Sequence, residues 1–269
     1  MKAGLNHQRI SLLGSNMSLV KREEIEQRLL AEALSGCNGY VCVANVHTTM
    51  TGFFDPNYRE ITNASSYSVP DGMPLVWAMR SLGAAGQDRV RGPSLMKKML
   101  ELGQAKNIRH YLYGGSPETL AALQQKIHED YPKALIVGVE SPPFRPLESY
   151  SEQDWVQAAE KINATNPHFV WIGLGAPKQE RWIWEQRSRV KGIQFAIGAA
   201  FDLIPGRVPE APQFLQSLGL EWLYRFYREP KRLWRRYLFN NPAFLVLWTQ
   251  QWVAARLFRR SYLCESKPL

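Results

Sequence analysis

Short apolar runs alternate with amphipathic helical patterns before residue 206, and this alternation constrains the fold more than any other feature of the chain. The runs are RISLLG, YVCVANV, IRHYLYGG, ALIVGV, HFVWIGLG and GIQFAIG. Strands that are separated by helices usually pair in parallel through right-handed crossovers. We therefore predict an α/β, Rossmann-like fold, in which a mostly parallel sheet is flanked by helices.

Helix starts between these runs are marked by capping residues. Asp55, Ser116 and Ser151 can each cap a helix, and the first two are followed by a proline at the first helical position. A further helix over residues 19–34 is expected to bury Ile25, Leu29 and Ala33.

The character of the sequence changes near Gly206, where proline and glycine become frequent. We predict an α/β catalytic core over residues 1–206 and a membrane-associating appendage over residues 207–269. The chain carries a formal net charge of +9, and residues 221–260 hold nine Arg or Lys against two Glu. The appendage is therefore expected to be helical, basic and amphipathic.

Two proline positions shape the expected helices of the appendage. Arg225, Arg228, Arg232 and Arg235 have helical spacing, but Pro230 interrupts them, which predicts a kink or a second helix. Another helix is expected to start at Asn241 and Pro242 and to carry Phe244, Leu245, Trp248 and Trp252. Its longest apolar stretch is far below the about 20 residues that span a bilayer. We favour a helix that lies on an anionic membrane surface; the alternative is a helix docked on the core.

Cysteine usage and the N-terminus favour a protein of the reducing cytoplasm. The three cysteines form no C-x-x-C pair, and no histidine pair has metal-ligand spacing. The first residues contain no uninterrupted apolar run ending in a small-residue cleavage site.

Polar residues follow several of the apolar runs, at the edge where parallel sheets bind ligands. They are Asn45 and His47, Asp71, Gly114 and Gly115, the stretch 173–179 and Asp202. Asp71 stands in SVPDGMPLVW, where Pro-Asp-Gly is a favoured turn sequence. It could equally be a general base held at a strand end, and the residues alone leave both readings open.

The stretches YGGSPE and GLGAPKQE are strand-to-helix turns that contain glycine. Such turns can present backbone N–H groups to a phosphate, although tight turns with positive φ explain YGGSPE without a ligand. Gln179 could cap a helix or donate to a substrate oxygen. Glu180 and Arg181 are expected on a solvated helix face, Trp182 in the core, and His47 as a hydrogen-bonded polar residue near a strand end.

No Asp-x-Asp pair occurs in the chain, although enzymes that bind nucleotide diphosphates through a divalent metal commonly use one. The charge on a leaving diphosphate is therefore expected to be met by groups other than a metal, and we expect no cofactor. Arginine is the obvious group to neutralise a leaving diphosphate.

Seven collinear stretches between about residues 10 and 240 resemble the WecG/TagA/CpsF glycosyltransferase family. They are VANVHTTM, PDGMPLVW, DRVRGPSLM, YGGSPE, GLGAPKQERWI, GAAFDLIPGRV and GLEWLYRFYREPKRLWRRYL. The resemblance implies inverting, metal-independent transfer of a sugar from a UDP-sugar to a polyprenyl-diphosphate-linked saccharide in cell-surface polysaccharide biosynthesis. The sugar would be N-acetylmannosamine, its uronic acid or a hexose such as glucose. The protein would be peripheral at the cytoplasmic face of the membrane and bound there through residues 221–260.

The resemblance also assigns site residues. It implies that Asp71 and Gln179 are catalytic, with Asp71 as general base, and that Asn45, Arg89, Asp202, Arg225, Arg232 and Arg235 bind substrate. The glycine turns add Gly114, Gly115 and Gly175 to the predicted substrate-binding set. Two positions depart from the family pattern. Val43 replaces a frequent threonine, and Glu210 stands where many members have arginine before Ala211 and Pro212.

Two other functions remain as alternatives. A nicotinamide-dependent oxidoreductase should carry G-x-G-x-x-G after its first strand, and LLGSNMSL lacks it. A non-enzymatic basic module for membrane surfaces or nucleic acid would leave the strand-end residues unused, and we expect no nucleic-acid partner. A homo-oligomer remains open.

Overall fold

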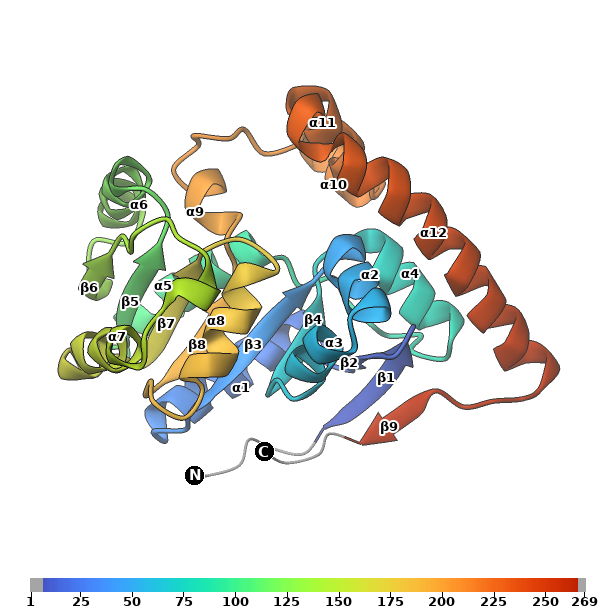
Figure 1. Cartoon of the computed structure of the whole chain (residues 1–269), viewed down its shortest axis with the longest axis horizontal. Helices are drawn as coiled ribbons and strands as arrows, with labels where there is room; N and C mark the ends of the chain where they lie inside the picture. The colour runs from blue at the N-terminus through green and yellow to red at the C-terminus, as the bar shows by residue number, and fades with distance from the viewer. Residues whose placement is uncertain (1–6, 266–269) are drawn as a thin grey trace.

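The computed structural model describes residues 7–265, except for the side chain of Arg232. Its centre is a six-stranded sheet in the order β4 (Tyr67–Pro70), β3 (Gly39–Ala44), β8 (Ile193–Ala196), β7 (Phe169–Gly173), β5 (Arg109–Gly114) and β6 (Leu135–Glu140). Every neighbouring pair in this sheet is parallel. The predicted α/β, Rossmann-like fold is confirmed, and five of the six apolar runs form strands of this sheet (Figure 1).

Helices cover both faces of the sheet and form a three-layer core. One face packs against α1 (Arg22–Leu34), α5 (Gly92–Gln104), α6 (Pro117–Asp130) and the short α9 (Ala200–Leu203). The other face packs against α7 (Glu152–Ala164) and α8 (Lys178–Gln186). Side chains alternate between the layers along each strand, so that Val41 and Val43 join the first and Tyr40 and Cys42 the second.

The predicted helix starts are confirmed. Asp55, Ser116 and Ser151 each accept a hydrogen bond from the backbone N–H three residues later, at the starts of α3 (Pro56–Asn63), α6 and α7. Helix α1 buries Ile25, Leu29 and Ala33 as expected. A short 3₁₀ helix, η1 (Leu147–Ser149), precedes α7.

The first apolar run, RISLLG, forms a strand but not in the parallel sheet. Strand β1 (Gln8–Leu12) pairs antiparallel with β2 (Ser15–Ser18) and with β9 (Leu263–Glu265). The turn between β1 and β2 places Leu13 at φ 52° and Gly14 at φ 85°, which joins two strands as a tight hairpin. A hairpin partner two residues away replaces the expected crossover, so the prediction of a parallel partner was wrong.

The C-terminal segment contains α10 (Gln213–Ser217), α11 (Glu221–Arg228) and α12 (Pro230–Leu257). The break that Pro230 predicts is confirmed, because α12 begins there. The helix start expected at Pro242 is wrong, since Pro242 lies inside the 28-residue α12. None of the described helices is long and apolar enough to cross a bilayer.

Packing explains why α12 continues through its proline. Phe244 is 1% exposed and joins a core cluster with Leu12, Met50 and Ala78, and Trp248 packs against the same cluster. Trp248 Nε1 also donates to Ser81 Oγ at 3.0 Å, at the end of α4 (Met73–Ser81). Burial of these side chains offsets the proline penalty of about 3 kcal/mol. Phe244 and Trp248 therefore face the core rather than a membrane.

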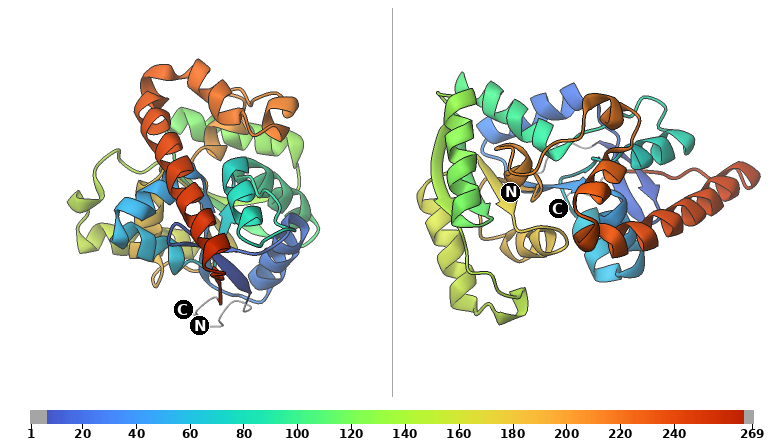
Figure 2. Two further views of the ribbon diagram at one scale, coloured as in Figure 1. Left: turned by 90° about the vertical axis from the view of Figure 1, so that its right-hand side faces the viewer. Right: turned by 90° about the horizontal axis from the view of Figure 1, so that it is seen from above.

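Helix α12 extends along one side of the molecule beside α2 (Val46–Phe54) and α4, and its far end leads to β9 (Figure 1). Figure 2 shows it crossing this side from α11 toward the antiparallel sheet. This placement brings α11 and the first turns of α12 to the carboxyl ends of β3 and β4.

Candidate active site

A cavity of about 100 Å³ lies at the carboxyl ends of β3 and β4, beneath α11 and α12. The core contributes Asn45 and His47, which follow β3, Asp71, which follows β4, and Arg89. The appendage contributes Glu221, Trp222, Arg225, Arg236, Tyr237 and Asn241. Polar residues that are far apart in the sequence therefore meet around one space.

Asp71 is held at this place by the backbone on both sides. Its N–H donates to Ala44 O at 2.7 Å, and the next residue, Gly72, caps α4. Its side chain is 29% exposed, toward the cavity. Burial raises the pKa of the Asp71 carboxyl above its ordinary 3.8, while Arg89 opposes the rise. The residue is both a turn residue and a cavity carboxylate.

Asn45 has a defined local role as well. It caps α2, because its Oδ1 accepts from Thr48 N at 3.1 Å while its own N–H donates to Thr48 Oγ1 at 2.8 Å. This capping box fixes the side chain at the cavity wall, one strand away from Asp71.

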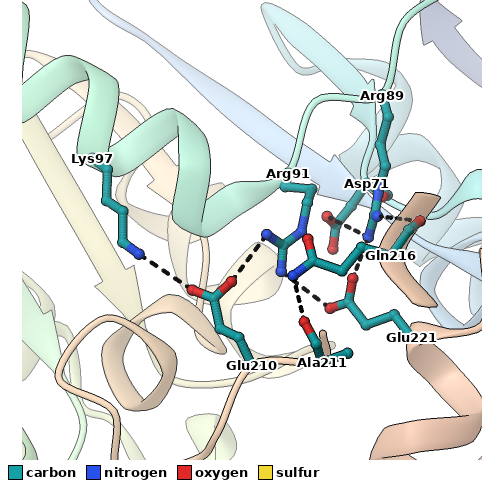
Figure 3. Close-up of polar contacts among 8 residues, drawn as sticks. All are labelled: Asp71, Arg89, Arg91, Lys97, Glu210, Ala211, Gln216 and Glu221. Atoms are coloured by element: carbon teal, nitrogen blue, oxygen red, sulfur yellow. Dashed lines mark hydrogen bonds and ion pairs between the residues drawn. The ribbon is translucent and has the colours of Figure 1, made fainter. Parts of the chain in front are cut away.

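Arg89 connects the core to the appendage (Figure 3). Its Nε donates to the backbone oxygen of Asp71, its Nη1 to Gln216 O at 3.4 Å and its Nη2 to Glu221 Oε2 at 2.6 Å. Nη2 lies 4.0 Å from Asp71 Oδ1. All three guanidinium nitrogens thus donate to other groups, and the Asp71 carboxylate lies at the limit of ion-pair distance without accepting a hydrogen bond from Arg89.

The ion pairs continue away from the cavity. Glu221 Oε1 accepts from Arg91 at 3.3 Å, Arg91 pairs with Glu210 at 3.1 Å, and Glu210 pairs with Lys97 at 3.3 Å (Figure 3). Although burial opposes it, Arg91 and Arg89 lower the pKa of Glu221 below 4.5. Glu210, which departs from the family pattern, therefore helps to hold the linker on α5.

His47 and Arg225 also line the cavity, and they differ in whether a side-chain nitrogen has a hydrogen-bond partner. His47 Nδ1 lies 2.9 Å from Asn240 Nδ2, which confirms a hydrogen-bonded histidine near a strand end. Burial, with a contribution from Arg236, lowers the pKa of His47 to about 4, so the ring is neutral at pH 7. Arg225 Nε is buried and has no hydrogen-bond partner among the described residues. An anion in the cavity would supply one.

The glycines and Asp202 lie at the ends of other strands and do not line this cavity. Gly114, Gly115 and Gly175 have φ of 115°, 75° and 79°, so the tight turns that glycine predicts are present. Asp202 accepts from Thr119 Oγ1 at 3.4 Å, at the first turn of α6. These residues form a second polar group around β5, β7 and β8.

Gln179 holds two loops of this second group together. It is 5% exposed, and its Oε1 accepts from Gly175 N at 3.1 Å and from Gly198 N at 2.9 Å. Its Nε2 donates to Glu180 Oε1 at 3.0 Å. The side chain points into the protein between the ends of β7 and β8.

The solvated position predicted for Glu180 is wrong, because its side chain is 1% exposed. Helix α8 lies between α3 and the sheet, which turns Glu180 inward and leaves Arg181 to pair with Asp55 at 2.6 Å. Burial raises the pKa of Glu180 to about 7. Trp182 is 0% exposed, as predicted for a core residue.

The predicted arginines of the appendage separate in the structure. Arg225 reaches the cavity, whereas Arg235 is exposed and lies over the Trp234 ring at 5.2 Å. The side chain of Arg232 lies outside the described residues. Arg236 lines the cavity and was not predicted. No signal in the sequence singles it out, because the contact of Asn240, one turn later, with His47 is a tertiary contact.

Among residues 7–265, no group of three or more His, Cys, Asp or Glu side chains could hold a metal ion. The cations around the cavity are side chains, chiefly Arg89, Arg225 and Arg236. Chemically, the cavity offers two carboxylates and several guanidinium groups that can neutralise an anion. Glu221 is paired with Arg89 and Arg91, so Asp71 is the carboxylate left to accept a proton.

Comparison with known proteins relates this arrangement to a family. The sequence profile described as "Glycosyl transferase WecG/TagA/CpsF family" matches residues 10–257. An N-acetylglucosaminyldiphosphoundecaprenol N-acetyl-beta-D-mannosaminyltransferase of Bacillus subtilis (strain 168) is 28% identical over 232 residues, covering 85% of this chain and 83% of the relative. The protein of the same description from Bacillus spizizenii (strain ATCC 23059 / NRRL B-14472 / W23) is 29% identical over 203 residues, covering 74% of each chain.

Proposed function

Because the chain belongs to the WecG/TagA/CpsF family of glycosyltransferases, we propose that it transfers a sugar from a UDP-sugar to a polyprenyl-diphosphate-linked saccharide. The names of both relatives support N-acetylmannosamine as the sugar and N-acetylglucosaminyl-diphosphoundecaprenol as the acceptor. The proposed transfer inverts the anomeric carbon and needs no metal.

One observation carries this proposal: a cavity carboxylate, Asp71, lies among Asn45, Arg89, Arg225 and Arg236. An inverting transfer needs a single carboxylate as base, and a departing diphosphate needs positive charge. The cavity supplies both kinds of group from two different parts of the chain.

In the proposed step, the acceptor hydroxyl oxygen attacks the anomeric carbon as Asp71 takes the hydroxyl proton. A bond forms from the acceptor oxygen to the anomeric carbon, and the bond from that carbon to the phosphate oxygen breaks. UDP leaves with the bonding electron pair. Arg225 and Arg236 stabilise the added negative charge on UDP, and one well-placed donor of this kind contributes about 3–4 kcal/mol.

The second polar group suits the donor nucleotide. Gly114 and Gly115 precede the N-terminus of α6, where free backbone N–H groups favour a phosphate, and Gly175 and Asp202 lie at neighbouring strand ends. Gln179 acts there by fixing the Gly175 turn through its hydrogen bonds. The Asp71 cavity of about 100 Å³ is smaller than the about 300–1,000 Å³ of typical ligand pockets. We therefore propose that the nucleotide lies at this second group and that the cavity receives the reacting end of the donor.

The outer surface of α11 and α12 suits a membrane. Its exposed apolar side chains include Leu223, Tyr227, Trp234, Leu238 and Phe239, and the exposed cations Arg228, Lys231 and Arg235 lie between them in the sequence. Aromatic rings and basic side chains together bind the interface of an anionic bilayer. We place the protein as a peripheral protein at the cytoplasmic face of the membrane, where a lipid-linked acceptor would reach the cavity.

The substitution Asp71→Asn tests the proposal, because it keeps the side-chain size and removes the proton acceptor. With UDP-N-acetylmannosamine and a polyprenyl-diphosphate-linked N-acetylglucosamine, UDP release should fall by about 10²–10⁴-fold. Donor binding measured by calorimetry should persist. Asp130→Asn, at an exposed position of α6, is the matched control. Turnover of Asp71→Asn at the control rate would refute Asp71 as base.

A further inference from the structure

Glu221 competes with Asp71 for the same arginine. Arg89 Nη2 lies 2.6 Å from Glu221 Oε2 but 4.0 Å from Asp71 Oδ1. The Nε of Arg89 is already bonded to the backbone oxygen of Asp71, so the guanidinium is tethered beside the carboxylate. Of the guanidinium nitrogens, Nη2 is the one that lies within ion-pair distance of Oδ1.

Direct contact would harm a general base in two ways. A cation at hydrogen-bond distance stabilises the ionised carboxylate and lowers its pKa, by about 1–3 units for an adjacent arginine. It would also occupy an oxygen lone pair that has to accept the proton from the acceptor hydroxyl. A site with several arginines and one base therefore needs a group that keeps the nearest arginine engaged elsewhere.

We propose that Glu221 is a positioning residue that holds Arg89 off the Asp71 carboxylate and thereby keeps Asp71 able to accept a proton. This inference rests on the proposed function, because it assumes that Asp71 is the base. Glu221 is well placed for the role, since its two oxygens bind Arg89 and Arg91 and its side chain is 16% exposed. It lies on α11, so Asp71 acquires its full strength as a base only while α11 is docked.

The charges around Asp71 determine the direction in which its pKa changes when Glu221 is removed. The charged and titratable groups around Asp71 are Arg89 and Arg91 ahead of α5, Glu221 and Arg225 on α11, His47 on α2, and Arg236 and Tyr237 on α12. Among them Glu221 supplies negative charge, and it raises the pKa of Asp71. Its removal lowers that pKa directly, and the release of Arg89 lowers it further.

The experiment is the pH profile of kcat/KM, which reports the base of the free enzyme. Glu221→Gln should move the acidic limb down by about one pH unit and lower the plateau, because a weaker base transfers the proton more slowly. Glu221→Asp keeps the charge and should return the limb toward the wild-type position. Glu210→Gln is the matched control, since it removes the other carboxylate of Arg91 and leaves Arg89 paired. Profiles in the His47→Gln background separate Asp71 from a histidine whose pKa is about 4.

A second variant keeps the test valid if Glu221→Gln does not fold. Arg89→Gln removes the guanidinium itself, so the acidic limb should move up rather than down. In that background Glu221→Gln should have a much smaller effect than alone, because no arginine remains to be released.

The outcomes distinguish the two proposals. An unchanged acidic limb in Glu221→Gln, or an equal change in Glu210→Gln, would overturn the positioning role and leave Glu221 as a docking contact of α11. Wild-type turnover of Asp71→Asn would instead overturn the general base itself, whatever the Glu221 profiles show.

Discussion

Glu180 makes the stability of the protein depend on pH in a way that one substitution can isolate. The carboxyl is 1% exposed, and its Oε2 has no hydrogen-bond partner among the described residues. Burial raises its pKa to about 7 from the ordinary 4.5. The folded state therefore binds a proton that the unfolded state releases between these two values. The contribution of the neutral carboxyl to stability is fully present below pH 4.5 and is lost as the pH rises through about 7.

The size of this pH-dependent contribution to stability follows from the difference between the pKa of Glu180 in the folded protein and its ordinary value. One pKa unit corresponds to about 1.4 kcal/mol, so ionising Glu180 in the folded protein costs about 3 kcal/mol at pH 8. Glu180→Gln has nearly the same shape, cannot ionise, and can still accept from Gln179 Nε2 through its amide oxygen. The variant should be about 3 kcal/mol more stable than wild type at pH 8, and less than about 1 kcal/mol more stable at pH 5.

Urea denaturation at pH 5, 6, 7 and 8 measures this difference. Glu185→Gln is the control, because it lies on the same helix with an exposed side chain and should change the free energy of unfolding by less than about 0.5 kcal/mol. If the stabilities of Glu180→Gln and wild type stay parallel across this pH range, a buried carboxyl that ionises near neutrality is refuted.

Three further predictions concern the appendage. Phe244→Ala should lower the free energy of unfolding by about 3–5 kcal/mol. The control Leu245→Ala, at a side chain that is 51% exposed, should change it by less than about 0.5 kcal/mol. Urea denaturation of both variants tests whether α12 is docked as described. Arg225→Ala should lower kcat for UDP release by about 10²–10³-fold, and a similar loss in the exposed Arg228→Ala would argue against a cavity role for Arg225. Phe239→Glu should weaken sedimentation with phosphatidylglycerol vesicles, while Phe144→Glu, outside the appendage, should bind as wild type does; equal binding of all three proteins would exclude this surface.

The parallel sheet could be predicted from the sequence because its inner strands β3, β5, β7 and β8 bury both faces, and a continuous apolar run is the direct result. Strand β4 was not among the six runs, since it has four residues and includes Ser68 and Pro70. Strand β9 pairs with β1 from the far end of the chain, and nothing local in Leu263–Glu265 indicates that partner.

The site was predictable where it follows strand ends, as for Asn45 and Asp71. It was not predictable where tertiary packing decides which side chains are buried and which reach the cavity. Glu180 has a polar neighbour on each side, and only the position of α8 between α3 and the sheet makes it buried. Arg236 rather than Arg235 reaches the cavity because of the phase at which α12 starts. The contributions of Gln179 and Arg225 to turnover stay predictions.

The pairing of β9 with β1 changes how a truncated chain has to be interpreted. Residues 207–262 leave the core at Gly206, and the chain returns to the core at β9. The segment is therefore attached to the core at both ends and is not a free C-terminal tail. Ending the chain at residue 206 would remove three cavity arginine or glutamate side chains, uncover the apolar surface beneath Phe244 and leave β1 as an unprotected edge strand. An inactive truncated protein could then reflect aggregation as much as lost chemistry. In a circular permutant, the paired residues Gln8 and Glu265 are joined and the chain is opened at one end of residues 207–262. Such a permutant would detach one end of this segment at a time and would separate aggregation from lost chemistry.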